Sequence, residues 1–369
     1  MAGRYDPLTR TAIRGGRTTV PDPTPAAPQG TDGPGTSPSD GPAPGPRTSQ
    51  APGSAPRTAP RPGTRTWTPP GPVDLGLILG PLRRGPADPT FRATAGAVWR
   101  ASRTPAGPAT LRVARDGTEV TATAWGPGAD WILDGLPELL GSADDPAAFV
   151  PRHRLVHASH RRRPGLRLTR TGLVLESLIP TVLEQKVTAD EAYRAWRRLV
   201  RQYGEPAPGP GPDGGGRGAG STLYVMPDPR TWTLIPSWDW HKAGVDSKRS
   251  ATIVRVARHA ARLEEATAMD LPAATARLEA IPGIGPWTST ETLQRSNGAA
   301  DAVTTGDLHL PGIIGYALAG DRDADDAAML ELLAPYAGQR HRAARLVLLA
   351  GAAPPRRAPR MPRSDIGKL

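Results

Sequence analysis

The chain has 369 residues, a formal net charge of +11 and no cysteine. The absence of cysteine excludes disulfides, thiolate metal sites, cysteine nucleophiles and iron–sulfur clusters. No apolar run approaches the roughly 18 to 20 residues that span a bilayer, and the first residues lack an apolar signal core, so we expect a soluble, cytoplasmic protein without a membrane partner.

Residues 1–66 are the first segment in chain order, and Pro, Gly, Thr, Ser and Ala dominate them without apolar periodicity. Such a composition buries too little apolar surface to fold, so we predict a disordered tail. The same argument predicts a flexible insertion at 206–220 and a basic disordered tail at 352–369.

The basic charge is concentrated near the two ends of the chain. Residues 1–66 hold eight Arg and four Asp, and residues 351–369 hold five basic residues and one Asp, which gives a net +4 in each case and leaves +3 of the +11 for the rest. Basic tails raise salt-sensitive affinity for phosphate, but a solvated linker is the simpler interpretation of these two.

Residues 67–168 are predicted to form a strand-rich domain. Short apolar alternations occur at 110–114 and 119–125, and Gly-containing turns separate such runs. The tetrapeptide 115–118, whose centre is Asp116-Gly117, fits a hairpin turn between two of these strands.

From Leu173 onward the apolar period becomes helical. Thr188 and Glu191 form a capping box, and Asp246 is suited to cap a second helix. Asp270 then precedes a third helix that leads toward residue 281. We predict an all-helical domain over 169–351, interrupted by the insertion at 206–220.

The stretch Ile281-Pro282-Gly283-Ile284-Gly285-Pro286-Trp287 is the most informative part of the chain. Its glycines permit a tight hairpin with accessible N–H groups, and its second proline suits the first turn of a helix, where phosphate binds well. Asp307 follows 22 residues after the second glycine, ahead of an apolar run. A Pro-Gly-x-Gly turn is common by itself, and most Gly-Asp pairs in such a place are only helix caps.

Taken together, the hairpin and Asp307 resemble the helix-hairpin-helix (HhH-GPD) DNA glycosylase superfamily, in particular its DNA-3-methyladenine glycosylase II branch. Further segments resemble landmarks of that family: 67–74, 163–168, 183–188, 244–249, Pro335, Tyr336, Arg342 and 346–349. The resemblance covers about residues 67–351. It implies an α+β fold, in which a small antiparallel β-sheet N-terminal domain precedes the all-helical glycosylase domain.

The resemblance implies an enzyme of base excision repair. Such enzymes rotate the damaged nucleotide out of double-stranded DNA, because stacking shields its glycosidic bond. Asp307 would stabilise the oxocarbenium character of the sugar and orient water. Bifunctional members carry Lys two residues after the second hairpin glycine, where this chain has Trp287. We therefore expect a monofunctional, nucleoid-associated enzyme that acts as a monomer on alkylated bases and leaves an intact abasic strand.

The resemblance also assigns DNA contacts. Those of the hairpin and its surroundings would come from Gly283, Ile284, Gly285, Trp287, Thr288 and Lys248. Gln185 and Lys186 occupy the loop that fills the gap left by the extruded nucleotide, although both could be ordinary surface residues. Carbonyls near Ile281 and Ile284 would hold a monovalent cation; no catalytic metal or other cofactor is implied.

The predicted base pocket departs from the family. Trp287 is suited to stack on an alkylated base, or it is a core residue. One turn later Glu291 replaces an aromatic residue, and 349–351 lacks a stacking tryptophan. Trp232, Trp238 and Trp240 could compensate. His309 is expected to play a supporting role, and the identity of the damaged base stays open.

Two other functional classes fit parts of the sequence. The same fold could serve a non-catalytic DNA-binding or lesion-sensing protein that has lost turnover through these pocket changes. A helical adaptor would instead use the Pro-rich segment 1–66 to bind protein partners.

Overall fold

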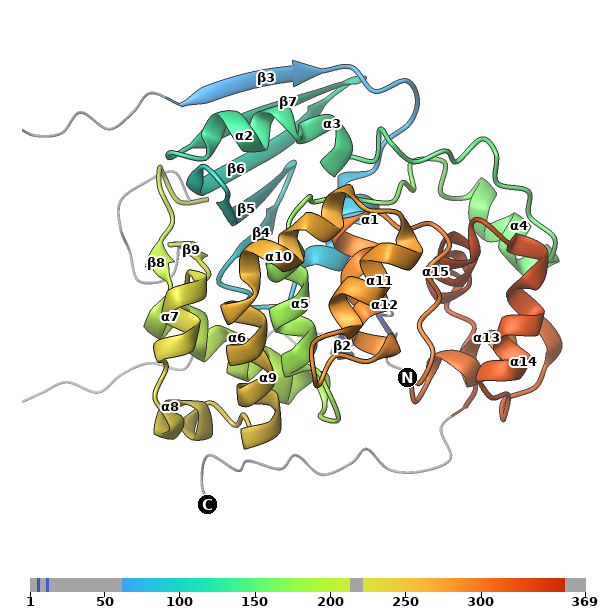
Figure 1. The fold of residues 1–369 in the computed structure, drawn as a ribbon. Coiled ribbons are helices and arrows are strands. Elements are labelled where there is room, and N and C mark those ends of the chain that lie inside the picture. Colours follow the sequence, from blue (N-terminus) through green and yellow to red (C-terminus); the bar gives the residue numbers. More distant parts are fainter. Residues whose placement is uncertain (1–4, 7–10, 13–61, 213–221, 356–369) are drawn as a thin grey trace, which may run out of the picture. The chain divides into compact units, whose positions relative to one another are not determined.

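A computed structural model describes residues 5–6, 11–12, 62–212 and 222–355 (Figure 1). The tails predicted over 1–66 and 352–369 therefore fall largely outside the described residues, as does the centre of the insertion. Two short strands near the start, β1 (Tyr5–Asp6) and β2 (Thr11–Ala12), pair in an antiparallel manner.

The first folded part is built on a five-stranded antiparallel sheet of order β3-β7-β6-β5-β4. Its strands are β3 (Gly63–Trp67), β4 (Phe91–Thr94), β5 (Ala97–Thr104), β6 (Gly107–Asp116) and β7 (Glu119–Trp125). Asp116 pairs with Glu119, and Gly117 adopts a φ of 56° between them. The predicted antiparallel sheet and its hairpin turn are confirmed.

The sheet begins earlier than predicted, because β3 starts at Gly63 within the range assigned to the tail. Its side chains alternate between half-buried and exposed, and the strand pairs along its whole length with β7. Only Trp67 is a large apolar residue here, so cross-strand pairing rather than an apolar pattern holds the strand. The sequence pattern of residues 63–67 therefore gave little indication of a strand.

Short helices cover one face of the sheet, and Figure 1 shows α2 lying over β6 and β7. The elements are α1 (Leu75–Leu79), η1 (Gly80–Leu82), α2 (Ala129–Asp134) and α3 (Leu136–Leu139). Their core joins Leu111 and Val120 of the sheet to Ile132 and Leu136 of the helices, all nearly inaccessible to solvent. This burial of apolar area fixes the first part.

A second core holds the helices that carry the hairpin. They are α5 (Val174–Leu183), α6 (Ala189–Tyr203), α7 (Pro229–Leu234), α8 (Ser237–Lys242), α9 (Ser247–Arg258), α10 (Ala260–Glu264), η2 (Glu265–Ala268), α11 (Leu271–Glu279) and α12 (Pro286–Ser296). The predicted caps are confirmed: Thr188 and Glu191 form the capping box of α6, and Asp246 and Asp270 cap α9 and α11.

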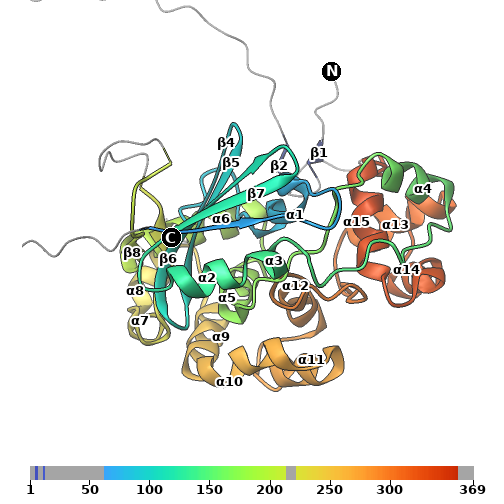
Figure 2. The same cartoon turned by 90° about the horizontal axis from the view of Figure 1, so that it is seen from above.

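A third core gathers the C-terminal helices with one helix from much earlier in the chain. They are α4 (Arg154–Arg161), α13 (Leu310–Ala319), α14 (Asp326–Leu333), η3 (Ala334–Tyr336) and α15 (Arg340–Ala350), which stand together in Figures 1 and 2. Val156 packs in this core, and Ser159 Oγ donates to the Leu346 carbonyl at 2.6 Å. Helix α4, which lies within the range 67–168 predicted for the strand-rich domain, therefore packs with the C-terminal helices.

The predicted insertion has structured ends. Strands β8 (Glu205–Pro206) and β9 (Tyr224–Val225) pair, and Ala207 N donates to the Leu223 carbonyl at 2.9 Å. A Cβ at Gly209 would lie 2.4 Å from the ring of Trp125, so this segment packs closely on the sheet. The described part of the insertion is therefore packed on the sheet, because Gly209 leaves room for the ring of Trp125.

Buried charges lie between the sheet and the second core. Arg84 pairs with Glu184 at 2.9 Å, with both side chains at most 7% exposed, and Arg100 pairs with Glu176. Burial raises the pKa of the Glu176 carboxyl, partly offset by Arg100. Glu264 accepts the first N–H groups of α5, yet burial raises its pKa to about 7.

Candidate functional site

The hairpin between α11 and α12 forms as predicted. Gly283 has a φ of 99°, and a Cβ there would meet Thr252 Oγ1 of α9 at 2.2 Å. Ile284 N donates to the Ile281 carbonyl at 2.9 Å, and both isoleucine side chains are buried, which fixes the hairpin on the core. No atom lies within 4 Å of where a Cβ of Gly285 would stand, so a ligand can approach this backbone closely.

Asp307 lies beside the hairpin helix. Its Oδ2 accepts a hydrogen bond from Trp287 Nε1 at 3.1 Å. Its Oδ1 accepts the N–H groups of His309 and Leu310 at 2.8 and 2.9 Å, which caps α13. The carboxylate is thus both a helix cap and a neighbour of the hairpin, and these three donors fix its orientation. It is half-buried rather than packed in the interior.

The loop between α5 and α6 is braced against the hairpin. Gln185 Nε2 donates to the Gly283 carbonyl at 3.0 Å and to Thr288 Oγ1 at 2.8 Å. Lys186 is exposed and, among the described residues, is the one non-glycine residue with a positive φ, at 55°. Such a conformation is uncommon for a lysine and sets a long cationic side chain on the rim of the site.

The two predicted phosphate contacts, Lys248 and Thr288, differ in exposure. Lys248 is exposed in the first turn of α9, the helix that packs on Gly283 through Thr252. Thr288 is 2% exposed, and its hydroxyl accepts the bond from Gln185. Its side chain therefore supports the hairpin from inside, and a contact of Thr288 with phosphate stays a prediction. Helix α12 buries this face against α5, which places the threonine within the core.

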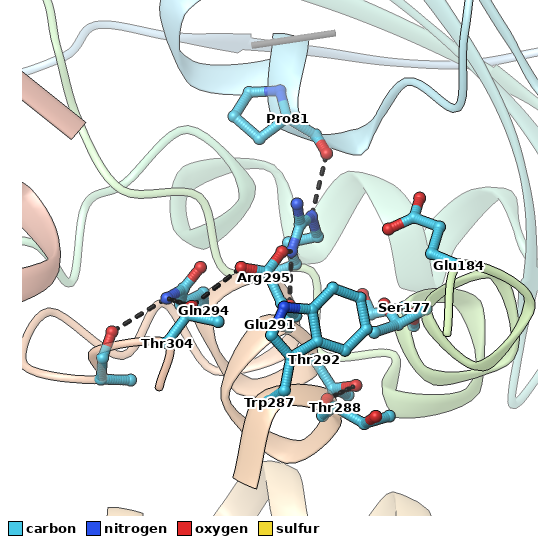
Figure 3. A network of polar contacts seen from close by, with 12 residues as sticks. Pro81, Ser177, Glu184, Trp287, Thr288, Glu291, Thr292, Gln294, Arg295 and Thr304 are labelled. Carbon is cyan, nitrogen blue, oxygen red and sulfur yellow. Dashed lines mark hydrogen bonds and ion pairs between the residues drawn. The ribbon is translucent and has the colours of Figure 1, made fainter. Parts of the chain in front are cut away.

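The predicted base pocket has a polar wall. Trp287, Glu291 and Arg295 follow one another at four-residue spacing on one face of α12, and Figure 3 shows them close together. Glu291 pairs with Arg295 at 2.9 Å and accepts a bond from Thr304 Oγ1 at 2.8 Å. Arg295 Nε donates to the Pro81 carbonyl at 3.0 Å, which ties this wall to the sheet domain (Figure 3).

The hollow beside this wall is small. A cavity of about 20 Å³ is lined by Arg84, Glu176, Ser177 and Arg295 together with neighbouring apolar groups. Ligand pockets usually measure about 300 to 1,000 Å³, so this cavity is too small for a base, and neither Trp287 nor Asp307 lines it. The pocket roles of Trp287 and Glu291 stay predictions.

The other tryptophans do not fill the pocket. Trp232 and Trp240 are 0% and 4% exposed and stack on each other in the second core with ring centroids 5.9 Å apart. Trp238 is 62% exposed on α8. The idea that they replace the missing pocket aromatics is wrong, because helical periodicity directs two of them inward. His309 is exposed next to Asp307.

Sequence reasoning missed two contacts that position the site. Arg84, 100 residues before Glu184, forms the buried pair that anchors the loop carrying Gln185. Arg255 Nε donates to the carbonyl of Pro282 in the hairpin at 3.0 Å. Neither pair has a local sequence signal, since each depends on segments that meet only in the folded chain.

The described residues contain no group of three or more His, Asp or Glu placed to hold a metal ion, and no helix among them is both long and apolar enough to span a bilayer. At the hairpin, the Ile281 carbonyl accepts one N–H group and keeps a second lone pair. The monovalent cation near Ile281 and Ile284 stays a prediction.

No family model and no curated protein matches the sequence. Solved structures do match. The 8-oxoguanine glycosylase/lyase of Clostridium acetobutylicum, in complex with double-stranded DNA containing cytosine opposite 8-oxoguanine, aligns over 76% of this chain and 91% of its own, with 12% identity and a TM-score of 0.59. The 3-methyladenine DNA glycosylase of Archaeoglobus fulgidus aligns over 77% and 97%, with 17% identity and a TM-score of 0.61. This chain has the fold of these DNA glycosylases.

Proposed function

We propose that this protein is a monofunctional DNA glycosylase that hydrolyses the N-glycosidic bond of damaged, alkylated bases in double-stranded DNA. The observation that carries the proposal is the hydrogen bond of 3.1 Å between Trp287 Nε1 and Asp307 Oδ2, which sets a carboxylate beside the glycine hairpin. Both structural neighbours are glycosylases by name, one for an oxidised base and one for an alkylated base.

In the proposed mechanism, the hairpin amides around Gly285 hold the phosphate backbone at the start of α12, where the helix dipole favours an anion. The exposed Lys186 occupies the space of the nucleotide that rotates out. Asp307 then faces the sugar of that nucleotide. Its fixed negative charge stabilises the developing oxocarbenium ion, and water completes the hydrolysis.

Two features favour an alkylated base and simple hydrolysis. Residue 287 is tryptophan, so the hairpin helix offers no amine for a Schiff base at the position that bifunctional members use. A cationic alkylated purine also leaves without a strong acid, so one carboxylate suffices. The indole of Trp287 provides an electron-rich face for such a cation.

The purified protein is expected to release free alkylated purines from methylated duplex DNA and to leave the strand uncut until alkali is added. Mass spectrometry of the released bases, with oxidised and deaminated duplexes in parallel, measures the activity and the lesion class together. Strand cleavage before alkali contradicts a monofunctional enzyme. No free base from any duplex, with binding intact, indicates the non-catalytic DNA-binding class instead.

Trp287→Phe is expected to slow base release about tenfold under single-turnover conditions and to change DNA affinity little. Phenylalanine keeps an aromatic face but cannot donate to Asp307, and a hydrogen bond to a charged group contributes about 1.5 to 3 kcal/mol. Trp238→Phe on the exposed surface of α8 is the matched control and should be neutral. If Trp287→Phe and wild type release base at the same rate, the indole does not position Asp307.

A further inference from the structure

A groove runs between α9 and α10 on one side and α11 on the other, and the proposed reaction makes no use of it. Its volume is about 650 Å³. Ile281 and Pro282 close one end, so the groove begins at the hairpin. This hollow is far larger than the small cavity beside Arg295 and lies within the range of pockets that hold ligands, about 300 to 1,000 Å³.

The floor of the groove is apolar. Leu263 is buried beneath it and Met269 is half-buried, while Ala273 and Ala276 of α11 and Ala280 at its C-terminal end are exposed. The three alanines recur at intervals of three and four residues, so they share one face of the helix. Their short side chains allow another backbone to approach closely, and exposed apolar surface of this kind commonly marks an interaction site.

Three arginines, Arg255, Arg262 and Arg277, line the groove. On one wall Arg255 Nε donates to the Pro282 carbonyl at 3.0 Å, which holds the guanidinium at the rim. On the other, Arg277 donates to the Arg262 carbonyl at 2.8 Å and pairs with Glu265 at 2.5 Å. The guanidinium of Arg262 is exposed and makes no ion pair within the described part of the chain. Because Glu265 already pairs with Arg277, the uncompensated charge belongs to Arg255 and Arg262. Cations beside an apolar floor favour a ligand that is both acidic and apolar.

We propose that this groove binds an acidic amphipathic peptide segment of another protein, with its apolar side chains on the alanines along α11 and its carboxylates on Arg255 and Arg262. Helical or extended segments of this kind dock in grooves through regularly spaced anchors. The terminal segments of this chain are unsuitable, because 1–66 and 351–369 each carry a net +4. Duplex DNA presents chiefly phosphates at its outer surface, so it would leave most of the floor uncovered.

The test uses the full-length protein and a fluorescein-labelled synthetic peptide of roughly 15 residues, with leucines at helical spacing on one face and glutamates elsewhere. Fluorescence anisotropy should show saturable binding of this peptide and none of a matched peptide with lysine for glutamate. Arg262→Glu and Ala276→Glu should each weaken binding at least about tenfold, which corresponds to about 1.4 kcal/mol. Arg258→Glu, an exposed arginine of α9 outside the groove, makes the same change of charge and should have little effect.

Absence of saturable binding overturns the proposal, and so does equal weakening by Arg258→Glu, which would indicate net charge alone. Anisotropy with an unmodified duplex is run on the same variants. If Arg262→Glu weakens duplex binding as much as peptide binding, the groove is a DNA surface and no peptide site. Base release by the Arg262→Glu variant should match that of wild type. The test of the peptide site therefore does not depend on whether the proposed glycosylase activity is found.

Discussion

Asp307→Asn is expected to lower base release from alkylated duplex DNA by a factor of roughly 100 to 1,000 while DNA affinity stays nearly unchanged. Removing one preorganised electrostatic group from an active site typically costs about 2.7 to 4 kcal/mol of transition-state stabilisation. Asparagine keeps the shape of the side chain, so its oxygen can still cap α13 through His309 and Leu310. Its amide nitrogen then faces the N–H of Trp287, and the negative charge is gone.

Release is measured by mass detection of free base in single-turnover reactions, and affinity by anisotropy with a lesion-bearing duplex. Asp325→Asn is the matched control, because Asp325 also caps a helix, α14, by accepting from Ala328 N at 2.9 Å. The control should release base like wild type. If both variants lose base release alike, the loss reflects a general effect of replacing Asp by Asn at a helix start, and the carboxylate at 307 has no specific part in the chemistry.

Local features of the fold could be predicted well from the sequence. The caps at Thr188, Asp246 and Asp270 and the turn at Gly117 depend on neighbours within a few residues, so the residue types alone indicate them. The proximity of Asp307 to the hairpin was inferred through the family resemblance. The hydrogen bond from Trp287 that joins the two was not predicted, because it depends on how α12 and α13 pack.

Features that depend on distant segments could not be predicted. Strand β3 is held by pairing with β7, and α4 by packing on α15, so neither has a decisive pattern of its own. Thr288 shows the same limit within the site. Its position in the sequence fits a phosphate contact, yet the side chain turns inward to Gln185, a residue 103 positions away. The apolar period of a helix shows which of its faces is buried, but it does not show which segment packs against that face.

Arg342→Met is expected to destabilise the protein by about 3 to 5 kcal/mol, the cost of leaving one member of a buried ion pair without its partner. Arg342 is fully buried and pairs with Asp144, whose side chain is 4% exposed. It also donates to Gln339 at 2.7 Å and lies over the ring of Phe149, with 5.9 Å from its central carbon to the ring centroid. Methionine fills similar space but leaves the carboxylate of Asp144 buried and unpaired.

Thermal unfolding should show the loss as a fall of roughly 10 °C, by the usual relation between stability and melting temperature. Arg340→Met, two residues earlier on α15, is the matched control. Arg340 pairs with Asp301 at 2.6 Å, but both side chains are about one-third exposed, so water screens the pair and the expected loss is about 1 kcal/mol or less. Adding Asp144→Asn to Arg342→Met should restore part of the stability, because it removes the stranded charge. If Arg342→Met and Arg340→Met lose equal stability, burial of the Arg342–Asp144 pair does not add to the stability with which α15 is held to the segment before α4.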